Sequence, residues 1–235
     1  MSPALYGILA SFAVVQEVPL TGPRLPQPAY EEEQAVEASR VVVFDVLERT
    51  GKCLVNVDAK DSMALLTAMP GTPANDRAIN KLRRHLPDCL GIGVQVTRFY
   101  GTIEVQLSGT ALMGAVAQAL YRVQFASRPP SSLAIPASVA PIMPPASAAN
   151  RQLLASYAFA QCLANAHPDA VRRLVLSKVG SREESAGFSQ VQQFMGPCVY
   201  GPVKADRNSL RLMLAQALYR WSVTAAATSV APAKP

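Results

Sequence analysis

The sequence predicts a mainly α protein made of two duplicated four-helix repeats, each closed by a disulfide, with a β-hairpin inserted in the first repeat. Two observations lead to this prediction. The hexapeptide AQALYR at residues 117–122 returns at residues 215–220. Upstream of each copy lies a cysteine pair with the same separation of 36 positions, Cys53 with Cys89 and Cys162 with Cys198. An internal duplication is the simplest explanation of both.

The composition suits a compact helical protein. Of the 235 residues, 50% are hydrophobic and 16% are charged, which is enough apolar material for a buried core and below the usual charged quarter. The net charge of +6 would allow weak contact with anionic surfaces. The basic residues are dispersed, however, and no basic stripe alternates with aromatic residues. We therefore expect no nucleic-acid partner.

The four cysteines predict one disulfide inside each repeat. They contain no Cys-x-x-Cys pair, which argues against a zinc or iron–sulfur site. In an up-down-up-down bundle the C-terminal ends of the first and third helices lie together, and both cysteines of each pair fall at those ends. Such disulfides require an oxidising compartment. Four free thiols in a cytosolic protein are the alternative.

The N-terminal segment, residues 1–29, begins with an apolar run and continues as a proline-rich linker. The run covers residues 4–15, too short to cross a bilayer as a helix but suited to a secretory signal peptide. It also offers a site of membrane association. No basic residue precedes Arg24, so a packed terminal helix is the alternative. We favour export because the cysteine pattern also requires it, and we expect a periplasmic location.

The first repeat spans residues 30–126, and capping residues mark its helices. Asp58 caps the second helix, while Thr72 and Pro73 supply the N-cap and first position of the third. Pro87 and Cys89 close the third helix. Thr110 is the expected N-cap of the fourth.

Residues 93–107 interrupt this helical pattern. Apolar and polar residues alternate there on both sides of Tyr100-Gly101, which predicts a β-hairpin insert. The second repeat is shorter at this place and has no full counterpart. We expect the insert, with Phe99 and Tyr100, to form a contact surface, although an idle loop fits equally well.

The last helix of each repeat has the clearest period of three and four. Its apolar positions are Leu112, Ala115, Val116, Ala119, Leu120 and Val123 in the first copy, and Leu210, Met213, Leu214, Ala217, Leu218 and Trp221 in the second. The hexapeptide is thus first of all part of a core-facing helix. A paired tyrosine–arginine interaction site is the functional alternative, formed by Tyr121, Arg122, Tyr219 and Arg220.

A proline-rich spacer, residues 127–149, separates the repeats or lets them fold back on each other. The second repeat then spans residues 150–223. In it Pro168 opens the second helix, Ser181 and Glu184 form a capping box for the third, and Asn208 is the expected N-cap of the fourth. Residues 224–235 read as a disordered tail.

The repeat resembles an uncharacterised family of exported alphaproteobacterial proteins. The resemblance rests on the cysteines, the glycine followed by serine or threonine before the third helix, and the final Ala-x-Ala-Leu-Tyr-Arg helix, over residues 46–122 and 156–220. It implies export and duplication. Since no activity is assigned to that family, the resemblance transfers no catalytic residue, and the hairpin insert departs from its pattern.

No catalytic constellation is evident. His85 and His167 are not shared between the repeats and lack a nucleophile motif. His85 and Cys89 have a helical spacing that suits a metal only if Cys89 is a free thiol. We expect neither a metal nor a cofactor.

The sequence therefore favours a non-enzymatic interaction or scaffold protein of the bacterial cell envelope, with a protein partner. A periplasmic carrier of a hydrophobic small molecule or lipid is the alternative, because helical bundles can open an apolar cavity. An enzyme ranks third.

Overall fold

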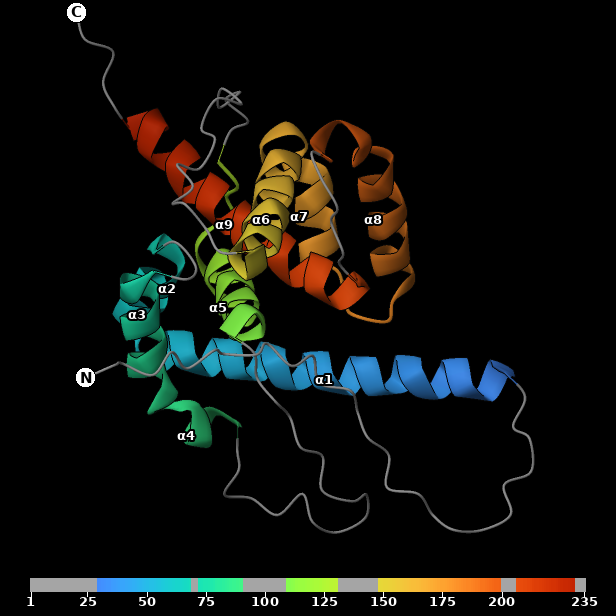
Figure 1. The fold of residues 1–235 in the computed structure, drawn as a ribbon, viewed down its shortest axis with the longest axis horizontal. Coiled ribbons are helices and arrows are strands. Elements are labelled where there is room, and N and C mark those ends of the chain that lie inside the picture. Colours follow the sequence, from blue (N-terminus) through green and yellow to red (C-terminus); the bar gives the residue numbers. More distant parts are fainter. Residues whose placement is uncertain (1–28, 69–71, 91–108, 131–147, 200–205, 231–235) are drawn as a thin grey trace, which may run out of the picture.

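The chain forms helices in every part that the structure, a computed structural model, describes: residues 29–68, 72–90, 109–130, 148–199 and 206–230. Figure 1 shows most of them packed on one side of a single long helix. The helices are α1 (Ala29–Val57), α2 (Ala59–Thr67), α3 (Pro73–Arg83), α4 (Leu86–Leu90), α5 (Gly109–Gln124), α6 (Ala148–Ala166), α7 (Pro168–Leu176), α8 (Arg182–Gln193), the 3-10 helix η1 (Gly196–Cys198) and α9 (Arg207–Val230).

The predicted fold class needs a correction. The described ranges are helical and contain no β-strand, so the part of the fold that the structure describes does not include a β-hairpin. The predicted insert, residues 93–107 with Phe99 and Tyr100, lies outside the described residues. Alternation over so short a stretch is weak evidence for strands, because an isolated two-stranded hairpin is marginally stable in water.

Most of the helix starts follow the predicted caps. The side chains of Asp58, Thr72 and Ser181 each accept a hydrogen bond from the backbone N–H three residues later. The fourth helices differ from the prediction. Thr110 lies inside α5, and α9 is capped by Asp206, whose carboxylate accepts from the N–H groups of Asn208 and Ser209. A carboxylate is favourable at the positive end of a helix.

Each predicted third helix ends before its cysteine. Helix α3 ends at Arg83 and Cys89 lies on the separate helix α4, while α8 ends at Gln193 and Cys198 lies in η1. Pro87 and Pro197 explain these breaks, because a proline cannot continue the backbone hydrogen bonds of a preceding helix.

Both predicted disulfides are present. Cys53 bonds to Cys89 with the α-carbons 5.4 Å apart, and Cys162 bonds to Cys198 with the α-carbons 5.7 Å apart. They link α1 to α4 and α6 to η1. Disulfides persist in oxidising environments, so the pair indicates a non-cytoplasmic or otherwise oxidising location.

Helices α5 and α9, which carry the two hexapeptides, pack against each other at the centre of the molecule (Figure 1). A Cβ added to Gly114 would lie 2.5 Å from the Cβ of Leu212, so this close approach depends on the missing side chain. Gly114 and Leu212 are equivalent positions when the hexapeptides are aligned. One hydrophobic core spans both halves of the chain, from Leu54 to Ala225.

Helix α1 supports this centre along one side (Figure 1). A Cβ on Gly51 would collide with the backbone carbonyl of Ala115, so α1 and α5 also approach closely at a glycine. Arg40 on α1 also reaches the other repeat, where it contacts Glu184 on α8. The two predicted repeats are therefore held together by α1 as well as by α5 and α9.

The order of helices is the same in the two halves, α1 to α5 and α6 to α9, each with a short helix before the last. Their origin by duplication stays a prediction. The predicted disordered tail is wrong in part, because residues 224–230 belong to α9. Residues 1–28 lie outside the described part, and within it no helix has both the length and the apolarity that crossing a membrane requires.

Candidate functional site

The structure places the predicted tyrosine–arginine residues mostly inside the protein. Tyr121 and Tyr219 are buried, on opposite members of the α5–α9 pair. Arg220 donates hydrogen bonds to the carbonyls of Leu66 and Ala68 at the end of α2, at 2.8 and 3.0 Å. Arg122 lies 3.6 Å from Glu48 and is 30% exposed. All four thus have neighbours within the chain.

A second arginine of α9, Arg211, also donates hydrogen bonds to carbonyls at a helix end, this time in the second half of the chain. The Arg211 guanidinium donates to the carbonyls of Val175 and Ser177 at the end of α7, at 3.0 and 2.6 Å. Counted from the first cysteine of each repeat, these two carbonyls match those that Arg220 binds. Carbonyls at a helix end lack intrahelical partners and carry negative partial charge, so both arginines stabilise these ends.

Arg211 also belongs to a buried charge network that the sequence did not suggest. Its Nη1 lies 3.0 Å from Glu184, and Glu184 in turn lies 2.6 Å from Arg40. Arg211 and Glu184 are almost completely buried. The capping box was the one sequence signal near this network: Ser181 caps α8, and Glu184 accepts a hydrogen bond from the Gly180 N–H. The network joins α1, α7, α8 and α9.

The network keeps its charges at neutral pH. Burial raises the pKa of the Glu184 carboxyl, but hydrogen bonds from Arg40 and Gly180 and the charge of Arg211 outweigh this effect and lower the pKa below its ordinary value. Burial lowers the pKa of Arg211 to about 10, and the Glu184 carboxylate opposes that shift. Because two arginines pair with one carboxylate, the simplest role for the network is structural: it holds the helices that carry these residues together.

A pH dependence follows for Glu184. Its pKa in the folded protein lies below the ordinary value of 4.5, so the carboxylate stabilises the fold above that pH, and this contribution is lost as the pH falls through the folded-state pKa. We expect Glu184→Gln to lower the free energy of unfolding at pH 7 by at least about 2 kcal/mol. The difference from wild type should shrink towards pH 3, as measured by urea unfolding at each pH.

The matched control is Asp45→Asn, which removes a carboxylate from an exposed pair with Arg49. Exposed pairs contribute little, so this variant should stay within about 0.5 kcal/mol of wild type at neutral pH. A Glu184→Gln loss that stays constant with pH would contradict the account of the network.

The histidines have local partners. His167 precedes α7 and stacks on Phe194, with ring centroids 3.8 Å apart. His85 accepts a hydrogen bond from Arg84 at 3.0 Å. The metal hypothesis for His85 and Cys89 loses its thiolate ligand, because Cys89 is in a disulfide.

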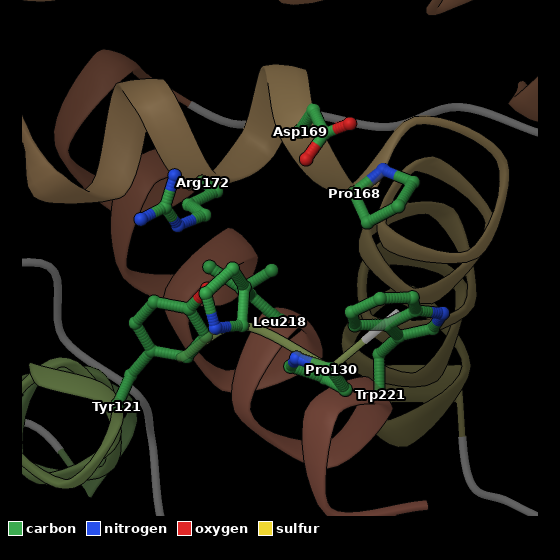
Figure 2. A pocket seen from close by; sticks show the side chains of 8 residues that line it. Tyr121, Pro130, Pro168, Asp169, Arg172, Leu218 and Trp221 are labelled. Atoms are coloured by element: carbon green, nitrogen blue, oxygen red, sulfur yellow. The ribbon is translucent and has the colours of Figure 1, made fainter. Parts of the chain in front are cut away.

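A pocket of about 220 Å³ lies where α5, α7 and α9 meet the chain that follows α5. Figure 2 shows Tyr121 and Arg172 on one side and Trp221 and Pro168 on the other, with Leu218 and Pro130 between them. Tyr121 is the only residue of this pocket that the sequence singled out as a candidate for interaction. The others were missed because they come from segments distant in sequence.

The fold and these sites define a disulfide-bonded protein that is helical throughout its described ranges and contains a buried arginine network. A scan against models of known protein families gives no match, and searches of the curated proteins and of the solved structures give none either. The resemblance to exported alphaproteobacterial proteins therefore stays a prediction.

Proposed function

We propose that this chain is a non-enzymatic helical interaction protein of the bacterial cell envelope, which acts through contacts with a protein partner. The two disulfides support an oxidising compartment, and the bacterial periplasm is such a compartment. The resemblance to exported proteins supports the same location.

An exposed apolar patch is the observation that carries the proposal. We define it as three exposed apolar side chains on the neighbouring helices α2, α5 and α9, namely Met63, Val123 and Val223, which are 39%, 70% and 43% exposed. Gln124 on α5 contacts the other two helices. Its amide nitrogen lies 3.8 Å from the Met63 sulfur on α2, and its amide oxygen accepts a hydrogen bond from Tyr219 on α9, one turn before Val223. Clustered exposed apolar side chains are typical of interaction sites.

Comparison of the two halves strengthens this argument. Alignment of the hexapeptides pairs Val123 with Trp221, and both were expected to face the core. Trp221 is 4% exposed and lies beside Pro130, whereas Val123 is 70% exposed. The segment that follows α5 thus covers this position of the second half, whereas the equivalent position of the first half stays open. A partner segment in contact with Val123 would complete the same arrangement.

The carrier hypothesis has less support. A cavity for a lipid between the two hexapeptide helices would require α5 and α9 to separate, and these helices are in direct contact at Gly114 and Leu212.

The test is photo-crosslinking in intact cells of the native host. A photoreactive residue at Val123 should link the chain to one exported protein, and Met63→Glu should reduce that product because it places a charge in the patch. The control is the same photoreactive residue at Asn80, which is exposed on α3. The same products from both positions, or a cytosolic partner, would overturn the proposal.

A further inference from the structure

The apolar patch of the proposed function and the pocket between α5, α7 and α9 occupy equivalent places in the two halves of the chain. Helices α2 and α7 both have 9 residues, and each begins at the same distance from the first cysteine of its half. Counted in this way, Met63 corresponds to Arg172, and alignment of the hexapeptides pairs Val123 with Trp221. Two residues of the patch therefore stand where the second half has two residues that line its pocket.

The surroundings of the two hexapeptide tyrosines support this equivalence. Tyr219 donates a hydrogen bond to Gln124 on the opposite helix. Burial raises the pKa of its counterpart, Tyr121, and interactions with Arg172 and Ser222 oppose this rise. Gln124 and Ser222 are equivalent positions when the hexapeptides are aligned. Each tyrosine thus reaches the same position of the other central helix.

In the second half, the chain that follows α5 covers this place. The Arg172 guanidinium donates a hydrogen bond to the carbonyl of Ala126 at 2.8 Å and so holds the start of the covering segment. Pro129 and Pro130 then line the pocket together with Trp221 (Figure 2), which is 4% exposed. Both prolines are non-helical. Because a proline ring fixes φ and leaves no backbone N–H to pair, two prolines make a rigid apolar cover.

In the first half, no described segment covers the equivalent place. Met63 and Val123 are 39% and 70% exposed. The positions that match the two prolines are Ala227 and Thr228, and both belong to α9, which continues to Val230. The chain after the second hexapeptide therefore stays helical where the chain after the first one turns back over the pocket.

The charge on α2 indicates what a covering segment carries. On α7, Asp169 lines the pocket, and the residue before the two prolines is the basic Arg128. On α2, the position of Asp169 is taken by Lys60, which is exposed and forms no ion pair with another described residue. The carboxylates nearest to it in sequence, Asp58 and Asp61, pair with other basic residues. The reversed charge favours a segment with an acidic residue where the internal segment has Arg128.

We infer that the apolar patch binds a non-helical, proline-containing segment of a protein partner, with an acidic residue of that segment beside Lys60. This inference rests on the proposed function, because it names the kind of segment that the same patch binds. The prolines contact Val123 and Met63. The amide nitrogen of Gln124, whose acceptor within the chain is the thioether of Met63 at 3.8 Å, donates to a backbone carbonyl of the segment, since a thioether is a weak acceptor. A proline-rich segment loses little conformational entropy on binding.

Three peptides based on the internal segment, residues 126–130 (ASRPP), provide the test. The first has glutamate in place of Arg128, the second keeps the arginine, and the third has the glutamate but alanine in place of both prolines. Each is added to the full-length, oxidised, isotope-labelled protein, and the amide NMR shifts are followed. The first peptide should cause saturable shifts that include Met63 and Val123, and the other two should bind at least about threefold more weakly.

Two results of the peptide titrations would overturn the inference. One is the absence of a saturable shift with the first peptide at concentrations up to about 10 mM. The other is equal binding of the arginine peptide or of the alanine peptide, because the charge and the prolines would then contribute nothing.

Charge-exchange variants assign the residues. Lys60→Glu should reverse the preference, so that the arginine peptide binds more tightly than the glutamate peptide, a result that unfolding would not produce. Lys178→Glu is the same change at an exposed lysine after α7 and should keep the original preference. Val123→Glu should weaken binding of the glutamate peptide at least about fivefold. An unchanged preference in Lys60→Glu would overturn the inference, and circular dichroism establishes that each variant is folded.

Mass spectrometry of the product cross-linked at Val123 in cells separates this inference from the proposed function. A proline-containing segment of the partner at the site of the link supports the inference. An exported partner linked through a segment without proline overturns the inference and leaves the proposed function standing. A link from Val123 to another part of the same chain would overturn both.

Discussion

Replacing Arg211 with methionine should destabilise the protein by about 3–5 kcal/mol, the cost of breaking a buried ion pair from one side. The variant loses the charge next to Glu184 and leaves the carbonyls of Val175 and Ser177 without their donor. Those carbonyls lie at the end of α7, so the loss should loosen the packing of α7 on α9. Denaturant unfolding followed by circular dichroism measures the change.

Arg182→Met is the control, because Arg182 is exposed on α8 and the substitution is the same. It should change the free energy of unfolding by no more than about 0.5 kcal/mol. Combining Arg211→Met with Glu184→Gln should cost less than the sum of the single losses, because the two side chains contact each other. A loss below about 1 kcal/mol for Arg211→Met would show that the network contributes no more than exposed pairs do.

Removing one disulfide should destabilise the protein by about 2–5 kcal/mol, since each closes a loop in the unfolded chain. The two bonds span the same separation of 36 residues. The Cys53→Ala/Cys89→Ala and Cys162→Ala/Cys198→Ala variants should therefore lose similar amounts, within about 1 kcal/mol of each other. Urea unfolding of both variants at pH 7 provides the comparison.

Wild-type protein under a thiol reductant is the control for the alanine substitutions. It should unfold at the same urea concentration as the variant without all four cysteines, because both lack both loop constraints. If either double variant is as stable as wild type, the corresponding disulfide does not stabilise the protein by lowering the conformational entropy of the unfolded chain.

The helix starts and the disulfides could be predicted because their signals are local or strictly spaced. An N-cap side chain accepts a hydrogen bond from the backbone N–H three residues later. The capping roles of Asp58, Thr72 and Ser181 could therefore be predicted without knowledge of any tertiary contact. The equal cysteine spacing predicted both bonds. The same kind of prediction was wrong for α9, which is capped by Asp206 and not by Asn208. Both residue types cap helices well, so the sequence alone does not show which of the two is the N-cap.

Exposure of equivalent residues could not be predicted. Val123 and Trp221 occupy the same slot of the helical period, yet one is exposed and the other is buried. The period identifies a face of a helix, but whether another segment covers that face depends on the path of the chain. Pro130 lies beside Trp221 because the chain turns there after α5.

The amino-acid pattern alone was sufficient for the helical class, the positions of most helices and the pairing of the cysteines, since each depends on neighbours along the chain or on a repeated spacing. The packing of the folded chain decided which polar residues meet. Glu184 joins Arg40 and Arg211 only when α1, α8 and α9 converge, and the pocket forms only where α5, α7 and α9 meet the chain that follows α5. Such contacts join residues far apart in sequence, and no periodic or local signal encodes them.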